Sequence, residues 1–600
     1  MTDGEPADLS RQLRRWGPLG AIVAIVLIVV VVVVASGGDD DGDDARTDLD
    51  TTTSEPTTDT DPDTDTTTDP DDGTTTSSDT GEDSADDVMA DGRVYWTEAD
   101  AAGVTGDFDW GEKCDTDLGT YAYPDFFAGE CVVPWTGDNG GATETGVTAD
   151  TITIVVYSAA EVDPVLDYIT GPISNDDTPD QVFETHVGLA EFYGAYFETY
   201  GRTVELVQYK ATGTSDDEVA AIADAETIAR DLQPFMVWSA PTLQVEVFGE
   251  TLAANGIMCN CNGGASAQDN YPYLHVVTKS PEQSRILLAE YIGKRLAGRN
   301  AIHSGDFTEQ ERTFGYLYLE TSDASTQVAE DFRDALADDY GVTLDPLIPY
   351  ELDPLTLQEQ ATTIIASLKS AGVTSIVFAG DPIAPRDFTL AATEQEYFPE
   401  WILSGTALVD TSVFGRTYDQ EQWAHAFGMS NTSVPIAREV GGNYFLYDWF
   451  HGEAPPAGDT IGIQWQASLT YALLQGVGPD LTHENFADAM LNAPPTRRGA
   501  ITAPSISFGS DKGLWPDEIL PDLNGIDDVS EVWWDPETVG VDELDREGPG
   551  IYQYVDGGTR YLPGAWPDTD PNVFVPEGAV DRYVTRPASE DPPDYPSPAG

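Results

Sequence analysis

Strands and helices alternate through more than half of this chain, and this alternation limits its fold more than any other feature. From Gly146 onward, short runs rich in β-branched residues are each followed by an amphipathic segment. The predicted strands are 146–160, 203–210, 235–240, 256–260, 313–321, 342–350, 374–380 and 399–405. The predicted helices are 178–197, 218–232, 243–255, 280–296, 327–339, 357–371 and 386–396. Strands separated by helices of this length form parallel sheets with helices on both faces.

Two helix starts carry a capping box. Thr178 is followed by Pro179 and by Gln181 at the third helical position, and Ser280 to Gln283 repeat the pattern. Such a pair satisfies free backbone amides at a helix start. His186 lies on the apolar face of the first of these helices, where a packed core histidine is favoured over a ligand.

The strands fall into two sets of similar size, so the sequence predicts an α/β fold of two Rossmann-like lobes with a cleft between them. On parallel sheets of this kind, ligands bind outside the carboxyl ends of the strands, where helix N-termini present free amides. The loops that follow the strands are therefore the candidate ligand loops.

Charge and motif content narrow the function. The chain has 107 acidic and 27 basic side chains and a formal net charge of −80. This balance excludes nucleic acid as a partner, because phosphate binding needs clustered Lys and Arg. No GxSxG, HExxH, Walker or GxGxxG motif is present, and the six histidines show no ligand spacing. We therefore expect no enzyme activity, no cofactor and no metal.

The N-terminal region predicts a membrane anchor followed by a spacer. Residues 17–36 are uncharged and long enough to cross a bilayer as a helix. Arginines in residues 1–16 place that short segment in the cytosol and the rest of the chain outside the cell membrane. The alternative is a signal peptide cleaved after Ala35. Residues 37–90, rich in Asp and Thr, predict a disordered stalk, with weak calcium binding as the less favoured interpretation.

Four cysteines are expected to form disulfides outside the cell. Cys114 and Cys131 lie in a Trp-containing cap subdomain, 91–145, where a bridge between them would contribute ~3 kcal/mol in the chain-entropy model. For Cys259 and Cys261 three alternatives stay open: a bridge across one residue, cross-pairing with the cap cysteines, or thiols that bind a soft metal.

The C-terminal part is predicted as an extension, 541–600. Aromatic-rich stretches at 531–540 and 550–567 suit either sugar stacking or packing against the body, and packing is favoured. The last residues, 588–600, are predicted to be disordered.

Five stretches together resemble a known family. They are GVTADTITIVVY, PYLHVVTKSPEQSRILLAEYI, TFGYLYLET, LKSAGVTSIVFAGDPIAPRDFTLAATEQEYFPEWILSG and ISFGSDKGLW. Their order resembles type I periplasmic binding proteins, the branched-chain amino acid group of ABC-importer receptors, in a membrane-anchored actinobacterial-type form. The resemblance implies a domain over 146–540 with three crossovers between its lobes. The first lobe would hold about 146–298 and 437–499, and the second about 299–436 and 500–540.

The resemblance also implies ligand contacts from loops after the strands. By position these are Ser239, Thr242, Asn260, Asn262, Ser322, Asp323, Asp381 and Thr406. Hydroxyls and amides at helix starts would suit a carboxylate, and Asp381 or Asp323 an ammonium. Members that bind α-amino acids have an aromatic residue where Asp381 stands and an acid near Thr406, so the resemblance does not name the ligand. Ser36 stands where lipoprotein members have a cysteine, so the hydrophobic helix would replace the lipid anchor.

The function expected from these features is capture of a small polar ligand for an ABC importer, with a permease as partner. The alternative is a ligand-sensing or adhesive ectodomain coupled to a partner membrane protein.

Overall fold

The computed structural model of the protein describes most of the chain after the stalk. The described residues are 92–160, 162–164, 177–238, 244–261, 267–321, 323–406, 408–458, 466–496 and 499–600. The predicted cytosolic segment, anchor and stalk lie outside them. Within the described residues, none of the helices is both long and apolar enough to cross a bilayer.

The first lobe is built on a four-stranded parallel sheet in the order β4–β3–β5–β6. Its strands are β3 (Thr151–Ser158), β4 (Thr203–Lys210), β5 (Met236–Trp238) and β6 (Met258–Asn260). Its helices are α5 (Pro179–Tyr196), α6 (Glu218–Thr227) with the π-helical turn η3 (Ile228–Leu232), α7 (Val245–Ala254), α14 (Gly442–His451), α15 (Gln466–Val477) and α16 (His483–Asn492).

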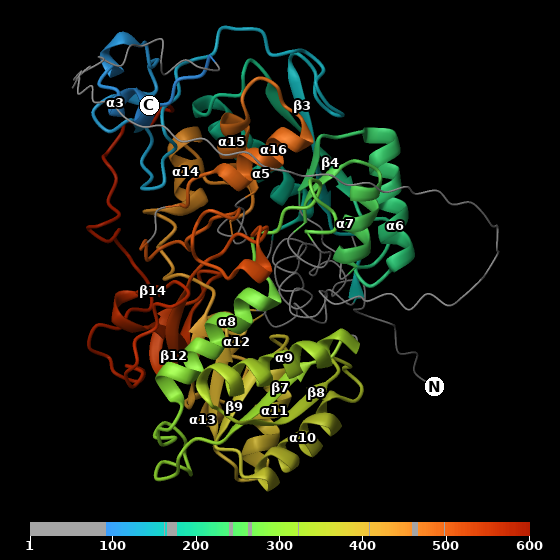
Figure 1. Ribbon diagram of the computed structural model, residues 1–600, viewed down its shortest axis with the longest axis vertical. Helices are drawn as coiled ribbons and strands as arrows, with labels where there is room; N and C mark the ends of the chain where they lie inside the picture. Colours follow the sequence, from blue (N-terminus) through green and yellow to red (C-terminus); the bar gives the residue numbers. More distant parts are fainter. Residues whose placement is uncertain are drawn as a thin grey trace, which may run out of the picture.

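Side-chain alternation along β3 shows why both faces of this sheet are covered. Ile154 and Val156 pack in one hydrophobic cluster with α5, α14, α15 and α16, whereas Val155 and Tyr157 pack in another with α6 and α7. Successive side chains of a strand point to opposite faces, and a parallel sheet buries both. Figure 1 shows α6 and α7 on one side of β4 and α5, α15 and α16 on the other.

The second lobe holds an eight-stranded sheet in the order β13–β12–β11–β10–β9–β7–β8, with β14 paired to β12. The strands are β7 (Phe314–Leu319), β8 (Leu344–Tyr350), β9 (Ser375–Ala379), β10 (Glu400–Ser404), β11 (Ala426–Ser430), β12 (Val529–Val541), β13 (Glu547–Tyr554) and β14 (Arg560–Tyr561). The helices are α8 (Pro281–Tyr291) with the π-helical turn η4 (Ile292–Leu296), α9 (Asp323–Tyr340), α10 (Leu357–Ala371), α11 (Ala384–Glu394), α12 (Ser412–Gly415) and α13 (Gln420–Trp423). Short 3-10 turns, η6 (Asp517–Ile519) and η7 (Val555–Gly557), lie in the connections.

The predicted α/β alternation and both capping boxes are confirmed. Thr178 Oγ1 accepts from the amide of Gln181 at 3.1 Å, and the Gln181 side chain accepts from the amide of Thr178 at 2.8 Å. Ser280 and Gln283 make the same two bonds at the start of α8. Each box satisfies two amides that would otherwise lack a partner.

Three chain segments cross between the lobes side by side, as the resemblance implies. The first leads from β6 to α8, the second from β11 to α14, and the third from α16 to β12. The amide of Ile526 in the third donates to the carbonyl of Val277 in the first at 2.8 Å. Lys279 of the first donates to Asn431 of the second at 2.9 Å and to the carbonyl of Asp528 of the third at 2.7 Å. The crossovers are thus tied together through a buried lysine.

The cap subdomain packs on the first lobe. It contains α3 (Trp96–Ala101), the 3-10 turn η1 (Thr105–Asp107), β1 (Cys114–Asp115) and β2 (Thr120–Tyr121). A disulfide joins Cys114 to Cys131, with their Cα atoms 5.7 Å apart. The hydroxyl of Tyr121 donates to Oε1 of Gln475 on α15 at 2.7 Å, which fixes the cap to the lobe.

The aromatic C-terminal stretches form strands that the periodicity did not predict. Residues 531–540 lie in β12, and 550–567 contribute most of β13 and all of β14. These strands run antiparallel next to β11, whose pairing with β10 is parallel. Trp534 is fully buried in the core of the sheet. The favoured interpretation, packing against the body, is therefore what the structure shows, and the extension predicted to begin at 541 completes the second lobe.

Two boundaries from the sequence differ from the structure. Residues 588–600, predicted to be disordered, lie against the body: Glu590 is buried and accepts from the amide of Ile501 at 2.6 Å, and the carbonyl of Tyr595 accepts from Trp449 Nε1 at 3.1 Å. Helix α8 lies before the predicted lobe boundary at 298 yet packs with β7 in the core of the second lobe. Its apolar face matches that sheet, and local sequence does not reveal which sheet a helix will cover.

Candidate functional site

The structure describes only part of the predicted ligand set. Ser239, Thr242, Asn262 and Ser322 lie outside the described residues, and Asp323 begins α9 without a described side chain. The residues that can be located are Asn260, Asp381 and Thr406. They lie at or just after the carboxyl ends of β6, β9 and β10.

The carboxyl edges of the two sheets meet. Ala159, just after β3 of the first lobe, packs in the same hydrophobic cluster as Leu319 and Tyr350, the last residues of β7 and β8 in the second lobe. Loops at this edge are where ligands of open α/β sheets bind. The space between these edges is therefore the place to look for polar groups without partners.

On the first lobe, such groups surround Trp238. Asn260 lies opposite Trp238 in the β5–β6 register and is buried, and its Oδ1 atom has no hydrogen-bond partner within the described structure. The ring of His186 on α5 lies 5.8 Å from that of Trp238, and its Nδ1 is equally unpaired. Burial lowers the pKa of His186 to about 4, so the imidazole is neutral near pH 7.

Helix α15 brings a third unpaired polar group to this place. Trp238 Nε1 donates to Oγ1 of Thr470 at 3.0 Å. Gln466 lies one turn earlier on the same face of α15, and its buried Oε1 has no partner in the described part of the chain. We call Trp238, Asn260, His186 and Gln466 the Trp238 cluster. Native proteins seldom bury polar atoms without a partner, so three around one side chain point to a ligand or bound water.

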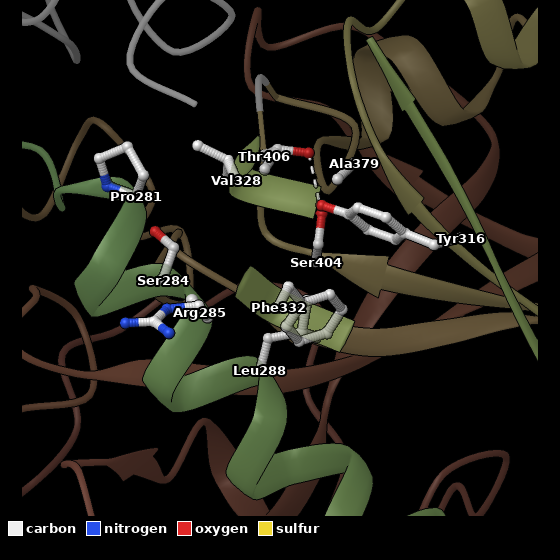
Figure 2. A pocket seen from close by; sticks show the side chains of 10 residues that line it. All are labelled: Pro281, Ser284, Arg285, Leu288, Tyr316, Val328, Phe332, Ala379, Ser404 and Thr406. Carbon is white, nitrogen blue, oxygen red and sulfur yellow. Dashed lines mark hydrogen bonds between the residues drawn. The ribbon is translucent and has the colours of Figure 1, made fainter. Parts of the chain in front are cut away.

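On the second lobe, Thr406 lines a small cavity of about 30 Å³. Its lining residues are Pro281, Ser284, Arg285, Leu288, Tyr316, Val328, Phe332, Ala379, Ser404 and Thr406. Figure 2 shows them around the cavity, with the four from α8 along one face of that helix. A water molecule needs only ~10–15 Å³, so the cavity has room for a small polar group. We call it the α8–α9 cavity.

Hydroxyl groups at the end of β10 are already engaged. Ser404 Oγ lies 2.7 Å from the carbonyl of Phe378. It also lies 2.9 Å from Oγ1 of Thr406 (Figure 2). Thr406 Oγ1 also accepts from the amide of Gly380 at 3.2 Å. Thr406 thus lines a cavity, and its hydroxyl holds the end of β10 through these hydrogen bonds.

Asp381 has a structural role. Its Oδ1 accepts from the amides of Ile383 at 2.7 Å and Ala384 at 2.9 Å, where α11 begins, and its Oδ2 accepts from Tyr350. The side chain is 1% exposed. Burial raises the pKa of the Asp381 carboxyl, while these hydrogen bonds oppose the rise. Because both carboxylate oxygens already accept these hydrogen bonds, Asp381 offers little to an ammonium group. The expectation that Asp381 would bind an ammonium group of the solute does not fit this geometry.

Cys259 and Cys261 are joined to each other by a disulfide that brackets Asn260. This pairing excludes the two alternatives in which they bridge to the cap or act as thiols. Within the described residues, His, Cys, Asp and Glu side chains form no group that could hold a metal ion.

Sequence reasoning missed Gln466, Ser284, Arg285, Tyr316 and Ser404. Ser284 and Arg285 directly follow the capping box that Ser280 and Gln283 form at the start of α8. The sequence therefore marked them as residues of the first helical turns after a crossover, and this was the signal that could have found them. Gln466 lies on α15 and Tyr316 on β7. The sequence does not tell which edge of a sheet these two elements reach, and only the folded chain shows it.

No family model and no curated protein matches this chain. Several solved structures have a similar chain path. A branched-chain amino acid transporter substrate-binding protein from Streptococcus pneumoniae, in complex with isoleucine, is 13% identical, covers 68% of this chain and 100% of its own, and has a TM-score of 0.42. A solute-binding protein of an ABC transporter from R. palustris, in complex with 4-hydroxybenzoate, is 12% identical, covers 67% of this chain and 97% of its own, and has a TM-score of 0.44. A fatty acid ABC transporter substrate-binding protein from Thermomonospora curvata is 14% identical, covers 72% of this chain and 100% of its own, and has a TM-score of 0.45. The ligands named here belong to those proteins.

Proposed function

We propose that this chain is an extracytoplasmic solute-binding protein that holds a small polar molecule between its two lobes and passes it to an ABC permease. The observation that carries the proposal is the Trp238 cluster. Three buried polar atoms without partners, from Asn260, His186 and Gln466, gather at the carboxyl edge of the first sheet. A solute with hydrogen-bonding groups would satisfy them, and the gain from doing so would favour binding.

The arrangement of the lobes supports this role. Three crossovers lie side by side and hydrogen-bond to each other, while each sheet has a hydrophobic core of its own. Two compact bodies joined along one narrow set of segments can rotate as units, because such hinges absorb the change in a few residues. Solute binding would then draw the edges together.

The N-terminal segment completes the proposal. An uncharged helix over 17–36, preceded by arginines, would tether the protein to the outer face of the cell membrane, and the acidic stalk would give it reach. The same placement suits the two disulfides, which persist in oxidising surroundings. Cell fractionation followed by protease treatment of intact cells tests it. Protection of residues after the stalk in intact cells would contradict the tether.

Ligand screening tests the solute-binding role. Purified protein is melted in the presence of single metabolites, and one present at ~100 times its Kd should add ~2.7 kcal/mol to the free energy of unfolding. Each hit is then titrated against Asn260→Ala and Gln466→Ala. The matched control is Gln358→Ala, which removes an exposed carboxamide on α10.

We expect the two cluster variants to weaken binding about tenfold each and the control to bind as the parent does. A hit that binds all three variants with parental affinity would place the solute elsewhere. A library in which no metabolite raises the melting temperature, together with hydrolysis of one of its members, would overturn the proposal.

A further inference from the structure

The strands at the ends of the two main sheets differ in how their outer edges are closed. Strand β6 is covered by residues 273–275, where the amide of Cys259 donates to the carbonyl of Tyr273 at 2.7 Å. Strand β8 carries Pro346 and Pro349. Prolines protect edge strands because they have no backbone N–H to offer to another chain.

Strand β13 is closed by a side chain and by a second segment. Arg416 donates to the carbonyls of Gly548 and Gly550 at 3.0 and 2.9 Å, and Tyr554 exchanges backbone hydrogen bonds with Val580. Native proteins close sheet edges in such ways because an open edge invites another chain to pair with it. Strand β4, at the remaining end, has no such cover among the described residues.

Three residues of β4 direct their backbone groups outward. The amide of Thr203 donates to the carbonyl of Asp150, just before β3, at 2.8 Å. In a parallel ladder every second residue bonds to the same neighbouring strand, so Val204, Leu206 and Gln208 face away from β3. Their amides and carbonyls have no hydrogen-bond partner within the described structure. This edge is therefore free to pair with an added strand.

A groove of about 620 Å³ lies along the open edge. Its walls are residues 203–207 of β4 and the face of α5 that carries Val187, Ala190 and Gly194. Five residues of a strand span ~16 Å, at ~3.3 Å each. The groove thus offers both backbone partners and space to an extended segment, which is the geometry of strand addition.

The charged side chains of the groove favour a basic segment. Glu191 on α5 and Glu205 on β4 are exposed, and neither has an ion pair or a hydrogen bond in the described part of the chain. The basic residue of the lining, Arg202, is buried and donates to four backbone carbonyls. The two carboxylates would therefore attract lysine or arginine side chains of an added segment.

The same charges count against two other occupants. The Asp-rich segment 37–90 of this chain would bring more carboxylates to a groove that already has two without partners. A second copy of the chain would bring its own Glu191 and Glu205. Like charges on adjacent strands destabilise the pairing.

The two faces of β4 specify the spacing of the basic residues. Leu206 packs in the hydrophobic cluster of α5 and Val207 in that of α6, so Glu205 lies on the α6 face and Glu191 on the α5 face. Side chains of an added strand alternate between the faces in the same way. Two adjacent basic residues would reach both carboxylates, whereas two separated by one residue would lie on a single face.

We infer that the outer edge of β4 and the α5 groove dock an extended segment of a partner protein, which adds as a strand and places lysine or arginine side chains next to Glu191 and Glu205. Backbone hydrogen bonds along 204–208 would supply affinity, and the two carboxylates would supply selectivity. The inference goes beyond the proposed function and does not depend on it, because no solute takes part.

Labelled peptides test the inference on the purified full chain. The probe is an octapeptide of valine and threonine with two adjacent lysines, and fluorescence polarisation measures its binding. One comparison peptide has glutamates in place of the lysines, and another has lysines separated by one residue. Two more carry N-methyl groups, either on alternate amides, which leaves one edge of the peptide able to pair, or on consecutive amides, which blocks both edges.

We expect blocking both edges to weaken binding at least about tenfold and blocking one edge to leave most of it. The acidic peptide should bind at least about tenfold more weakly than the probe, and the peptide with separated lysines about two- to fivefold more weakly. Equal binding of the peptide blocked on both edges would mean attraction by charge alone and would overturn strand addition. Tighter binding of the acidic peptide would overturn the choice of a basic partner in favour of the chain's own acidic segment.

Variants of the two carboxylates test the selectivity. Glu191→Gln and Glu205→Gln should each weaken binding of the probe about two- to fivefold. Glu250→Gln, which changes an exposed glutamate on α7, is the matched control and should bind the probe as the parent does. An equal loss in all three variants, or no loss in any, would overturn the docking of basic residues in this groove.

Hydrogen exchange reports the edge itself. The amides of Leu206 and Gln208 should exchange fast in the free chain and several-fold more slowly with the probe at saturation, whereas those of Glu205 and Val207, bonded to β3, should be slow throughout. Unchanged exchange of Leu206 and Gln208 would overturn the inference. Slow exchange of both in the free chain, together with a dimer in sedimentation, would overturn it in favour of a second copy.

Discussion

Tyr350 and Asp381 bind each other in both directions. The hydroxyl of Tyr350 donates to Oδ2 of Asp381 at 2.5 Å, and the backbone amide of Asp381 donates to that hydroxyl at 3.0 Å. The other carboxylate oxygen accepts from the amides of Ile383 and Ala384. The pair therefore fixes the end of β8 to the turn between β9 and α11. A residue that the family resemblance assigns to the ligand is thus used inside the second lobe.

We predict that Asp381→Ala lowers the free energy of unfolding by ~1–3 kcal/mol, because it leaves buried amides without an acceptor. Tyr350→Phe, which removes one hydroxyl, should cost ~1 kcal/mol. Urea denaturation measures both. Neither variant should change the affinity for a solute found by screening. A loss of binding at unchanged stability would return Asp381 to the ligand contacts.

Arg312 and Glu400 form a bidentate ion pair in the core. Nε and Nη2 of Arg312 lie 2.7 and 2.9 Å from the two carboxylate oxygens, and both side chains are at most 1% exposed. We predict that Arg312→Met destabilises the protein by ~3–5 kcal/mol, because Glu400 would stay buried and charged without its partner. Adding Glu400→Leu to that variant should recover much of the loss. Guanidinium denaturation of Arg312→Met, Glu400→Leu and the double variant measures this. A double variant whose loss equals the sum of the two single losses would contradict the prediction.

Asp522 predicts a pH dependence of stability. Burial raises its pKa to about 7 from an ordinary value of 3.8, against the opposing hydrogen bonds from the Asn524 amide and the Gln283 side chain, both at 2.9 Å. Between these pH values the folded protein holds a proton that the unfolded chain has lost. The free energy of unfolding should therefore fall as pH rises from about 4 to about 7.

The substitution Asp522→Asn isolates this contribution. An amide keeps the acceptor oxygen but does not titrate, so the stability of the parent relative to Asp522→Asn should fall by up to ~1.4 kcal/mol per pH unit across that range. Asp150→Asn, which changes an exposed carboxylate, is the control. Parallel curves for the parent and Asp522→Asn would show that Asp522 ionises normally in the folded state.

The C-terminal residues should contribute to stability. Glu590 accepts hydrogen bonds from the amide of Ile501 and the hydroxyl of Thr502, and Ser597 donates to the carbonyl of Trp449. We predict that removing residues 588–600 lowers the free energy of unfolding by ~1–3 kcal/mol, since the Ile501 amide would lose its acceptor. Limited proteolysis and urea denaturation of the shortened and full chains measure it. An unchanged denaturation midpoint would mean that these contacts are not maintained in solution.

The α/β part of the fold could be predicted because its elements are encoded locally. The strand from Thr151 is a β-branched run, and the helix over Leu357–Ala371 has both the apolar period and the bounds that the structure gives it. The antiparallel strands β12 and β13 were missed because Trp533 and Trp534 follow one another without a period of two, both being buried in the second lobe.

By itself, the sequence determined the alternation of strands and helices, the caps that start α5 and α8, and the acidity from which we expect no nucleic-acid partner. These depend on residues close together in the chain. Only the tertiary structure decided which polar groups lack partners, because that depends on what the folded chain brings next to each group. Asp381 found three hydrogen bonds within its own lobe, whereas Arg285, Asn260 and Gln466 found none among the described residues. A buried polar group is often hydrogen-bonded by a residue from a distant segment of the chain. No local sequence pattern shows whether the fold brings such a residue next to it.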